Sequence, residues 1–163
     1  MERGGRQFPA QFCSHSYPNN NPHHLLSCHR VHDPGQHFLK KSIEGRNAAM
    51  IAELYKQSRS VSIYPILRNI FRTMQEEQEI SLALLYGSYA KGIPSNTSDI
   101  DIYIDTLNPR VKKQLEQRHS FLSVKIGEFD PQSLLIREII KDHVIIKGVE
   151  VYFDKTGFFE KTV

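Results

Sequence analysis

The stretch LALLYGSYAKGIPSNTSDIDIYID, residues 82–105, decides the fold because it holds two apolar runs joined by a turn and a polar loop. The second run starts with two acids one residue apart, Asp99 and Asp101. In a β-strand, side chains at positions i and i+2 lie on the same face. The alternation therefore predicts a strand over residues 99–105, with a buried isoleucine face and a face of carboxylates that ends at Asp105.

Two carboxylates on one rigid strand suit Mg²⁺, which takes hard oxygen ligands and is completed by substrate phosphates and water. Asp99 also fits an ordinary turn residue at a strand entrance. Asp101 lies inside a hydrophobic strand, where an unpaired carboxylate is costly, so it needs a metal or a cationic partner. Asp105 is further along and marks the exit of the strand. We therefore expect Asp99 and Asp101 to be metal ligands.

The first apolar run predicts a strand over about residues 81–86, and the Gly-Ser pair that follows it, Gly87 and Ser88, predicts a turn with a short helix to residue 92. Glycine lets the backbone approach a phosphate, and the N–H groups that open a following short helix point toward an anion. Ser88 adds a hydroxyl donor. Lys91, about one turn later, is either a phosphate-binding residue or a solvated lysine. Gly-Ser turns are common, but ten residues separate Ser88 from Asp99, and this spacing makes the combination specific.

The composition is typical of a globular protein with one domain and a tail: 163 residues, 39% hydrophobic and 24% charged. No apolar run approaches the roughly 18 to 20 residues of a transmembrane helix, and the polar start is not a secretory signal. We expect a cytoplasmic protein with no membrane association. The net charge of +3 permits nucleic-acid binding without arguing for it.

Residues 1–36 are predicted to be a flexible tail, because they are rich in proline and asparagine and lack periodicity. Both cysteines, Cys13 and Cys28, lie there, and six of the eight histidines lie within the first 37 residues. Such residues could form a zinc site, but structural zinc sites usually bring their cysteines in close pairs. A polar leader without metal is the alternative, and a disulfide is not expected in a cytoplasmic protein.

Helical periodicity predicts a first helix over residues 38–59, in which Gly45 allows a break, and a second from Pro65 to about residue 79. The apolar stripe of the first helix comprises Ile43, Met50, Ile51, Leu54 and Tyr55. That of the second comprises Ile63, Ile66, Leu67, Ile70, Phe71 and Met74. Both stripes are expected to pack on a core.

After the strand at residues 99–105, Asn108-Pro109 predicts a helix start, and residues 121–127 read as a third strand. Asp130-Pro131 repeats the cap for a helix to about residue 142. Its buried residues are expected to be Leu134, Leu135, Ile139 and Ile140. A last apolar piece, residues 144–153, is expected to form a short strand or hairpin.

The predicted order is therefore α-α-β-α-β-α-β-α-β, a mixed α/β (α+β) fold. It consists of a small mixed β-sheet with helices packed against it, preceded by two N-terminal helices and the tail. We divide the chain into a tail at residues 1–36, an N-terminal helix at residues 37–62 and a main domain at residues 63–163.

The stretch GSYAKG, followed at this distance by SDIDIYID, resembles the signature of the DNA polymerase beta-like nucleotidyltransferase superfamily, most closely its minimal nucleotidyltransferases (MNT). The resemblance implies a nucleotidyltransferase-like fold. It also implies that Gly87 and Ser88 hold the triphosphate of a nucleotide and that Asp99 and Asp101 ligate Mg²⁺. An acceptor hydroxyl would attack the α-phosphate of ATP, and pyrophosphate would leave.

The chain departs from the family at a third acid, which usually comes from a later strand beside the two-acid strand. Residues 121–127 contain no acid, and Lys125 occupies about the expected position. Glu128 and Asp130 follow the strand, with Asp130 better explained as a helix cap, and Glu150 and Asp154 are further candidates. Either an acid such as Glu128 serves through a bulge, or the third ligand is missing.

The main hypothesis is thus a Mg²⁺-dependent nucleotidyltransferase that moves AMP from ATP to a hydroxyl of a protein or other acceptor. The resemblance also suggests the antitoxin of a HEPN-MNT pair, with an all-helical HEPN-type partner, and a homo-oligomer is a further option. The alternative is a degenerate module that binds nucleotide or partner without transfer. Nucleic-acid binding through residues 38–77 is not favoured, because their basic residues are mixed with acids. These basic residues are Arg46, Lys56, Arg59, Arg68 and Arg72.

Overall fold

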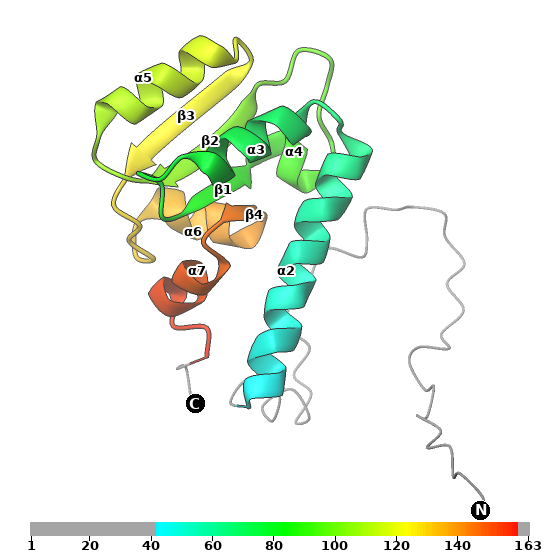
Figure 1. Cartoon of the computed structure of the whole chain (residues 1–163), viewed down its shortest axis with the longest axis vertical. Helices are drawn as coiled ribbons and strands as arrows, with labels where there is room; N and C mark the ends of the chain where they lie inside the picture. The colour runs from blue at the N-terminus through cyan, green and yellow to red at the C-terminus, as the bar shows by residue number, and fades with distance from the viewer. Residues whose placement is uncertain (1–41, 160–163) are drawn as a thin grey trace, which may run out of the picture.

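The computed structural model describes residues 42–159, which form a four-stranded mixed sheet with six helices around it (Figure 1). The strands are β1 (Ala83–Tyr86), β2 (Ile100–Asp105), β3 (Leu122–Gly127) and β4 (Val144–Lys147), in the order β3-β2-β1-β4. β1 runs antiparallel to β2 and β4, whereas β2 and β3 are parallel. The mixed α/β sheet predicted from the sequence is confirmed. Within the described range, no helix is long and apolar enough to span a bilayer.

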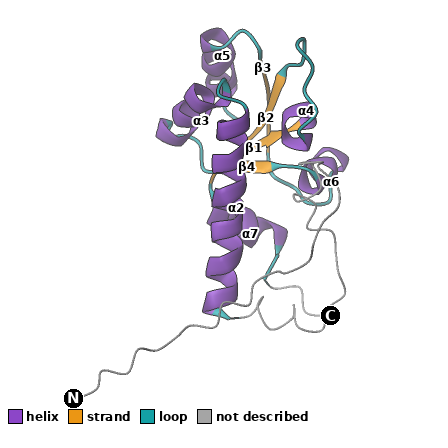
Figure 2. Cartoon of the chain, turned by 90° about the vertical axis from the view of Figure 1, so that its right-hand side faces the viewer, coloured by secondary structure: helices purple, strands orange, loops and turns teal. Residues whose placement is uncertain are grey.

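Helices cover both faces of the sheet. Figure 2 shows α3 (Leu67–Glu76) and α5 (Pro109–Arg118) on one side of the strands, and α4 (Gly87–Lys91) and α6 (Leu134–Lys141) on the other. The isoleucines of β2, at positions 100, 102 and 104, are fully buried in one cluster with apolar residues of α3 and α5. The predicted isoleucine face is therefore the main core.

The opposite face of β2 was predicted to be a row of carboxylates, but only part of this face is open. Tyr103 is 2% exposed and packs edge-on against Phe129, and its hydroxyl donates to the carbonyl of Gly127 at 2.9 Å. Asp105 accepts from the backbone N–H of Phe129 at 3.0 Å and pairs with Lys155 at 2.8 Å. A second core cluster, which includes residues of α6 and α7 (Val149–Thr156), thus covers the far half of this face. The half near Asp101 is less covered.

The N-terminal helix, α2 (Ile43–Ile63), runs without a break at Gly45. Ser42 caps it, because the Ser42 hydroxyl accepts the N–H of Gly45 at 3.0 Å. Residues 38–41 of the predicted helix lie outside the described residues, as do the predicted tail and both cysteines with their neighbouring histidines. α2 joins the sheet through Gln57, whose side-chain amide donates to the carbonyls of Ile145 and Ile146 in β4.

The apolar stripe predicted to bury α2 is largely exposed. Ile43, Ile51, Leu54 and Tyr55 are 49% to 76% exposed, although Met50 packs against the second cluster. The buried positions of α2 are instead Gly45 and Ser60. α2 meets the edge strand β4 through the polar side chain of Gln57 and packs on the core through Met50 and Val61, so the four exposed apolar residues are turned away from the core.

The second helix begins later than expected. Pro65 and Ile66 form a turn, α3 starts at Leu67, and Ile63 and Ile66 are about half exposed. The remaining four residues of its stripe are buried, as predicted. The start of α5 is also confirmed, because the Asn108 side chain accepts the N–H of Arg110 at 3.0 Å.

Two predictions in the C-terminal part were wrong. α6 is capped by Ser133 rather than Asp130, and Leu134 and Leu135 are 80% and 44% exposed, with Ile136 buried instead. Ile139 is buried as predicted, and Ile140 is partly buried against the second cluster. Residues 144–147 form the expected strand, but residues 149–156 form α7 instead of continuing as a hairpin.

Candidate functional site

The pairing of β1 with β2 brings the Gly-Ser turn beside the two-acid motif. Tyr86 lies opposite Asp101 in the antiparallel register, and Gly87 follows with φ = 70°. A Cβ atom on Gly87 would collide with the Oδ2 atom of Asp101. Two separate reasons therefore favour glycine at this position: the backbone is left-handed, and the Asp101 carboxylate leaves no room for a side chain.

The other predicted nucleotide-binding residues follow directly on α4. Ser88 is half-buried, and its carbonyl accepts the N–H of Ile93 at 3.0 Å, which closes the helix over Gly92. Lys91 is exposed at the last turn. Its charge is one of several that lower the pKa of the Glu138 carboxyl on α6, after the larger effect of Lys141. The side chain of Lys91 is thus available on the side of the sheet that carries Asp101.

Asp101 lies in an unfavourable place for a negative charge. It is half-buried, and this burial raises the pKa of its carboxyl above the usual range. Hydrogen bonding from Ser123 lowers that pKa, nearby Asp99 raises it, and Lys125 lowers it. Burial together with the charge of Asp101 raises the pKa of the Tyr86 hydroxyl to about 12. Two interacting carboxylates are the oxygen ligands that Mg²⁺ prefers, so the residues present fit one such ion.

Asp99 and Asp101 differ in their surroundings. Asp99 is exposed and immediately precedes β2, whereas Asp101 is the second residue of the strand. The loop before them is held by Ser95 and Ser98, because the Ser95 N–H donates to the Ser98 hydroxyl at 2.9 Å. The rigid strand fixes Asp101, and Asp99 remains accessible to a ligand.

Glu128 is not brought to these two acids. Gly127, the residue before it, lies opposite Asp105, four residues along β2 from Asp101. At about 3.3 Å per residue, this places Glu128 roughly 13 Å or more from Asp101 along the strand. Across residues 42–159, no three His, Cys, Asp or Glu side chains are grouped so that they could hold a metal ion.

The other acids considered from the sequence have other surroundings. Asp130 accepts the N–H of Gln132 at 2.9 Å in the turn before α6. Asp154 pairs with Arg46 of α2 at 3.3 Å. Glu150 lies in the first turn of α7. None of these interactions connects them to Asp101.

Ser123 is the residue that sequence reasoning missed. The parallel register of β2 and β3 pairs Asp101 with Ser123 and Tyr103 with Lys125. The position next to Asp101 is therefore held by a serine, and Lys125 lies two residues further along the edge strand. Aligning the apolar alternation of residues 100–104 with that of residues 122–126 would have given this register.

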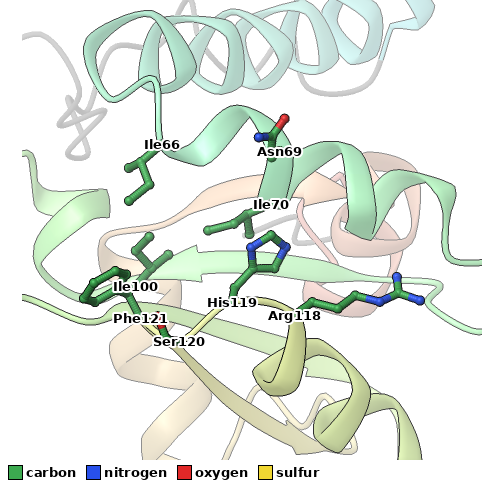
Figure 3. A pocket seen from close by; sticks show the side chains of 8 residues that line it. All are labelled: Ile66, Asn69, Ile70, Ile100, Arg118, His119, Ser120 and Phe121. Atoms are coloured by element: carbon green, nitrogen blue, oxygen red, sulfur yellow. The ribbon is translucent and has the colours of Figure 1, made fainter.

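A pocket of about 270 Å³ lies on the opposite face of the sheet (Figure 3). Ile70 and Ile100 are its buried residues, and His119 lies centrally with Arg118 at one end. The full lining comprises Ile66, Asn69, Ile70, Ile100, Arg118, His119, Ser120 and Phe121. The pocket contains none of the predicted site residues, since the side chain of Ile100 faces away from Asp101.

Two comparisons with known proteins gave matches. The family model described as "Polymerase beta, Nucleotidyltransferase" matches residues 68–155, more than half of the chain. A solved structure entitled "Crystal structure of the toxin-antitoxin with AMP-PNP" is 23% identical, with a TM-score of 0.39, over 61% of this chain and 80% of its own. No curated protein matches. The chain belongs to the polymerase beta nucleotidyltransferase family.

Proposed function

We propose that this family member transfers AMP from ATP to a hydroxyl group of a protein or other acceptor, with Mg²⁺ as cofactor. The observation that carries the proposal is the close approach of Gly87 to the carboxylate of Asp101. Through it, a turn suited to phosphates lies directly beside acids suited to a divalent cation. Asp99 is exposed and Asp101 is half-buried, so both carboxylates are accessible from solvent.

In this proposal, Gly87 and Ser88 bind the triphosphate through backbone N–H groups and the serine hydroxyl, and Lys91 adds a positive charge. Asp99 and Asp101 hold a magnesium ion, which when bound neutralises charge on the phosphates. The acceptor oxygen forms a bond to the α-phosphorus while the bond to the β-phosphate oxygen breaks. Pyrophosphate leaves, and the hydroxyl proton passes to solvent. Positioning and charge stabilisation suffice for such a transfer.

We further propose a protein as the acceptor or partner, with an all-helical HEPN-type protein as the candidate that the MNT resemblance suggests. A contact with another protein is supported by the exposed apolar residues of α2, which are Ile43, Ile51, Leu54 and Tyr55. Exposed apolar side chains that lie together on a surface are typical of protein–protein interaction sites. In this role the chain would act as an antitoxin.

One observation favours a second candidate, a module that binds nucleotide or partner without transfer. The resemblance implies a further acid from a strand beside β2, whereas β3 pairs Ser123 with Asp101 and Lys125 with Tyr103. With two carboxylates, a nucleotide can still be held through one metal ion, while activation of the acceptor is weaker.

The test is incubation of the full chain with α-³²P-labelled ATP, Mg²⁺ and a cell extract. The wild type and the Asp130→Asn control are expected to label a protein, and Asp101→Asn is expected to label none. Calorimetry with α,β-methylene-ATP separates the candidates. Nucleotide binding without any labelling would support the binding module, and absence of both would refute the two candidates together.

A further inference from the structure

Asp101 has two neighbours across the sheet, and neither is an acid. Tyr86 of β1 lies opposite it on one side and Ser123 of β3 on the other. Residues that are paired in a sheet share a face, so these are the side chains that flank the carboxylate. Gly87 then follows on the β1 side. Ser123 is therefore the β3 residue directly beside Asp101, and a ligand bound between Asp101 and β3 would contact it.

The β3 side of Asp101 carries positive rather than negative charge. Ser123 is paired with Asp101 across the two strands, and Lys125 lies two residues further along β3 on the same face. Lys125 is exposed on the edge strand, on the same face as Tyr103, with which it pairs. Ser123 is half-buried. A neutral donor and an ammonium group thus occupy this side.

Two acids near this side, Asp105 and Glu116, are engaged elsewhere, and Glu128 lies beyond the far end of β3. Asp105 is held by the Phe129 N–H and by Lys155. Glu116 of α5 accepts the backbone N–H of Val124 at 3.1 Å, on the α5 side of β3. In the part of the chain described, no third acid joins Asp99 and Asp101.

We infer that this site holds one divalent cation per chain, and that the ammonium group of Lys125 supplies the positive charge on the β3 side of Asp101. The inference rests on the proposed nucleotide-binding function of the same site. Asp99 and Asp101 provide carboxylates for a single ion that the triphosphate completes. A second dication between Asp101 and β3 would find a neutral hydroxyl and a repelling ammonium group instead of a carboxylate.

Lys125 also lies across β2 from the phosphate-binding turn, because the sheet order places β3 and β1 on opposite sides of β2. The triphosphate is proposed to lie on the β1 side, at Gly87. Lys125 is therefore a charged residue on the side of β2 away from that turn, and Ser123 is the neutral residue beside Asp101.

The test counts manganese ions by electron paramagnetic resonance, with the full chain saturated by α,β-methylene-ATP and Mn²⁺ added in steps. The wild type is expected to bind one Mn²⁺ per chain together with the nucleotide. The double variant Ser123→Asp/Lys125→Ala is expected to bind a second ion at least about tenfold more tightly than the wild type does. Circular dichroism checks that the variant is folded.

A second measurement isolates the charge of Lys125. Lys125→Ala is expected to weaken binding of the manganese–nucleotide complex about threefold to tenfold. Lys125→Arg should restore it, and Lys113→Ala, an exposed lysine on α5, should leave it unchanged. Two ions in the wild type, or equal affinity of Lys125→Ala and Lys113→Ala, would overturn the inference. If the wild type binds no manganese–nucleotide complex at all, the proposed function itself fails, which is a distinct result.

Discussion

Replacing Gly87 by alanine tests whether the turn and the acid form one site. Gly87 has φ = 70°, a conformation that costs alanine about 1–2 kcal/mol. The added Cβ would also collide with the Asp101 carboxylate, which must rotate away at a cost of about 0.5–1.5 kcal/mol. Together these effects should lower the free energy of unfolding by roughly 1.5–3.5 kcal/mol.

Gly92→Ala is the matched control, because Gly92 has nearly the same backbone, with φ = 75°. Both variants should lose the backbone contribution of about 1–2 kcal/mol, measured by urea unfolding. Gly87→Ala alone should also displace Asp101 and weaken binding of the Mn²⁺–α,β-methylene-ATP complex about 10- to 100-fold, measured by calorimetry. If Gly87→Ala binds this complex as tightly as Gly92→Ala, the turn and the carboxylate do not form one site.

Three further predictions concern charge. Since burial raises the pKa of the Asp101 carboxyl, Asp101→Asn should be more stable than the wild type at pH 7, by less than about 1 kcal/mol after solvent screening. This gain in stability should shrink at low pH, where the wild-type carboxyl is protonated. Urea unfolding midpoints at pH 7 and pH 4 measure the difference. Lys91→Gln should weaken nucleotide binding about tenfold in calorimetry, whereas equal effects of Lys91→Gln and Lys113→Gln would remove Lys91 from the site. Burial, and then the charge of nearby Lys56, lower the pKa of the His143 imidazole to about 4. As the pH drops from 6.5 to 4, the unfolded chain binds a proton at this histidine before the folded chain does. The free energy of unfolding should therefore fall by about 3 kcal/mol over this range. His143→Leu should flatten that part of the unfolding profile, and an unchanged slope would contradict the assignment.

The local pattern of residues 82–105 was enough to predict β1, α4 and β2, because alternation and a turn are local properties. The same pattern did not show that Tyr103 belongs to a second core. That burial depends on Phe129, which lies 26 positions later and reaches Tyr103 only through the fold. The carboxylate face was therefore predicted to be more open than it is.

The ends of helices and the last element were less predictable. Asp130-Pro131 and Ser133 are both good caps, and only the structure shows that the Ser133 hydroxyl accepts the N–H of Ile136. Residues 149–153 carry β-branched and aromatic side chains that favour a strand. Gly148, with φ = 81° and no room for a Cβ against the Ser81 carbonyl, turns the chain so that these residues form a helix.

The sequence could not reveal which face of α2 is buried. An apolar stripe in the sequence shows which residues lie on one face of the helix. The edge of a sheet can nevertheless bind another face of that helix through specific polar contacts. Gln57 makes such contacts with β4, and Leu54 and Tyr55 are left exposed. Likewise, the resemblance suggested that Lys125 lies at about the position of the third acid, whereas the strand register pairs Ser123, and not Lys125, with Asp101.

The central claim, transfer of a nucleoside monophosphate at Asp99 and Asp101, is tested most directly with two labels. The full chain is incubated with Mg²⁺, a cell extract and ATP labelled at either the α- or the γ-phosphate. Nucleotidyl transfer predicts that the α-label enters a protein while the γ-label leaves as pyrophosphate, and that Asp101→Asn abolishes both. Incorporation of the γ-label, or α-labelling that persists in Asp101→Asn, would contradict it.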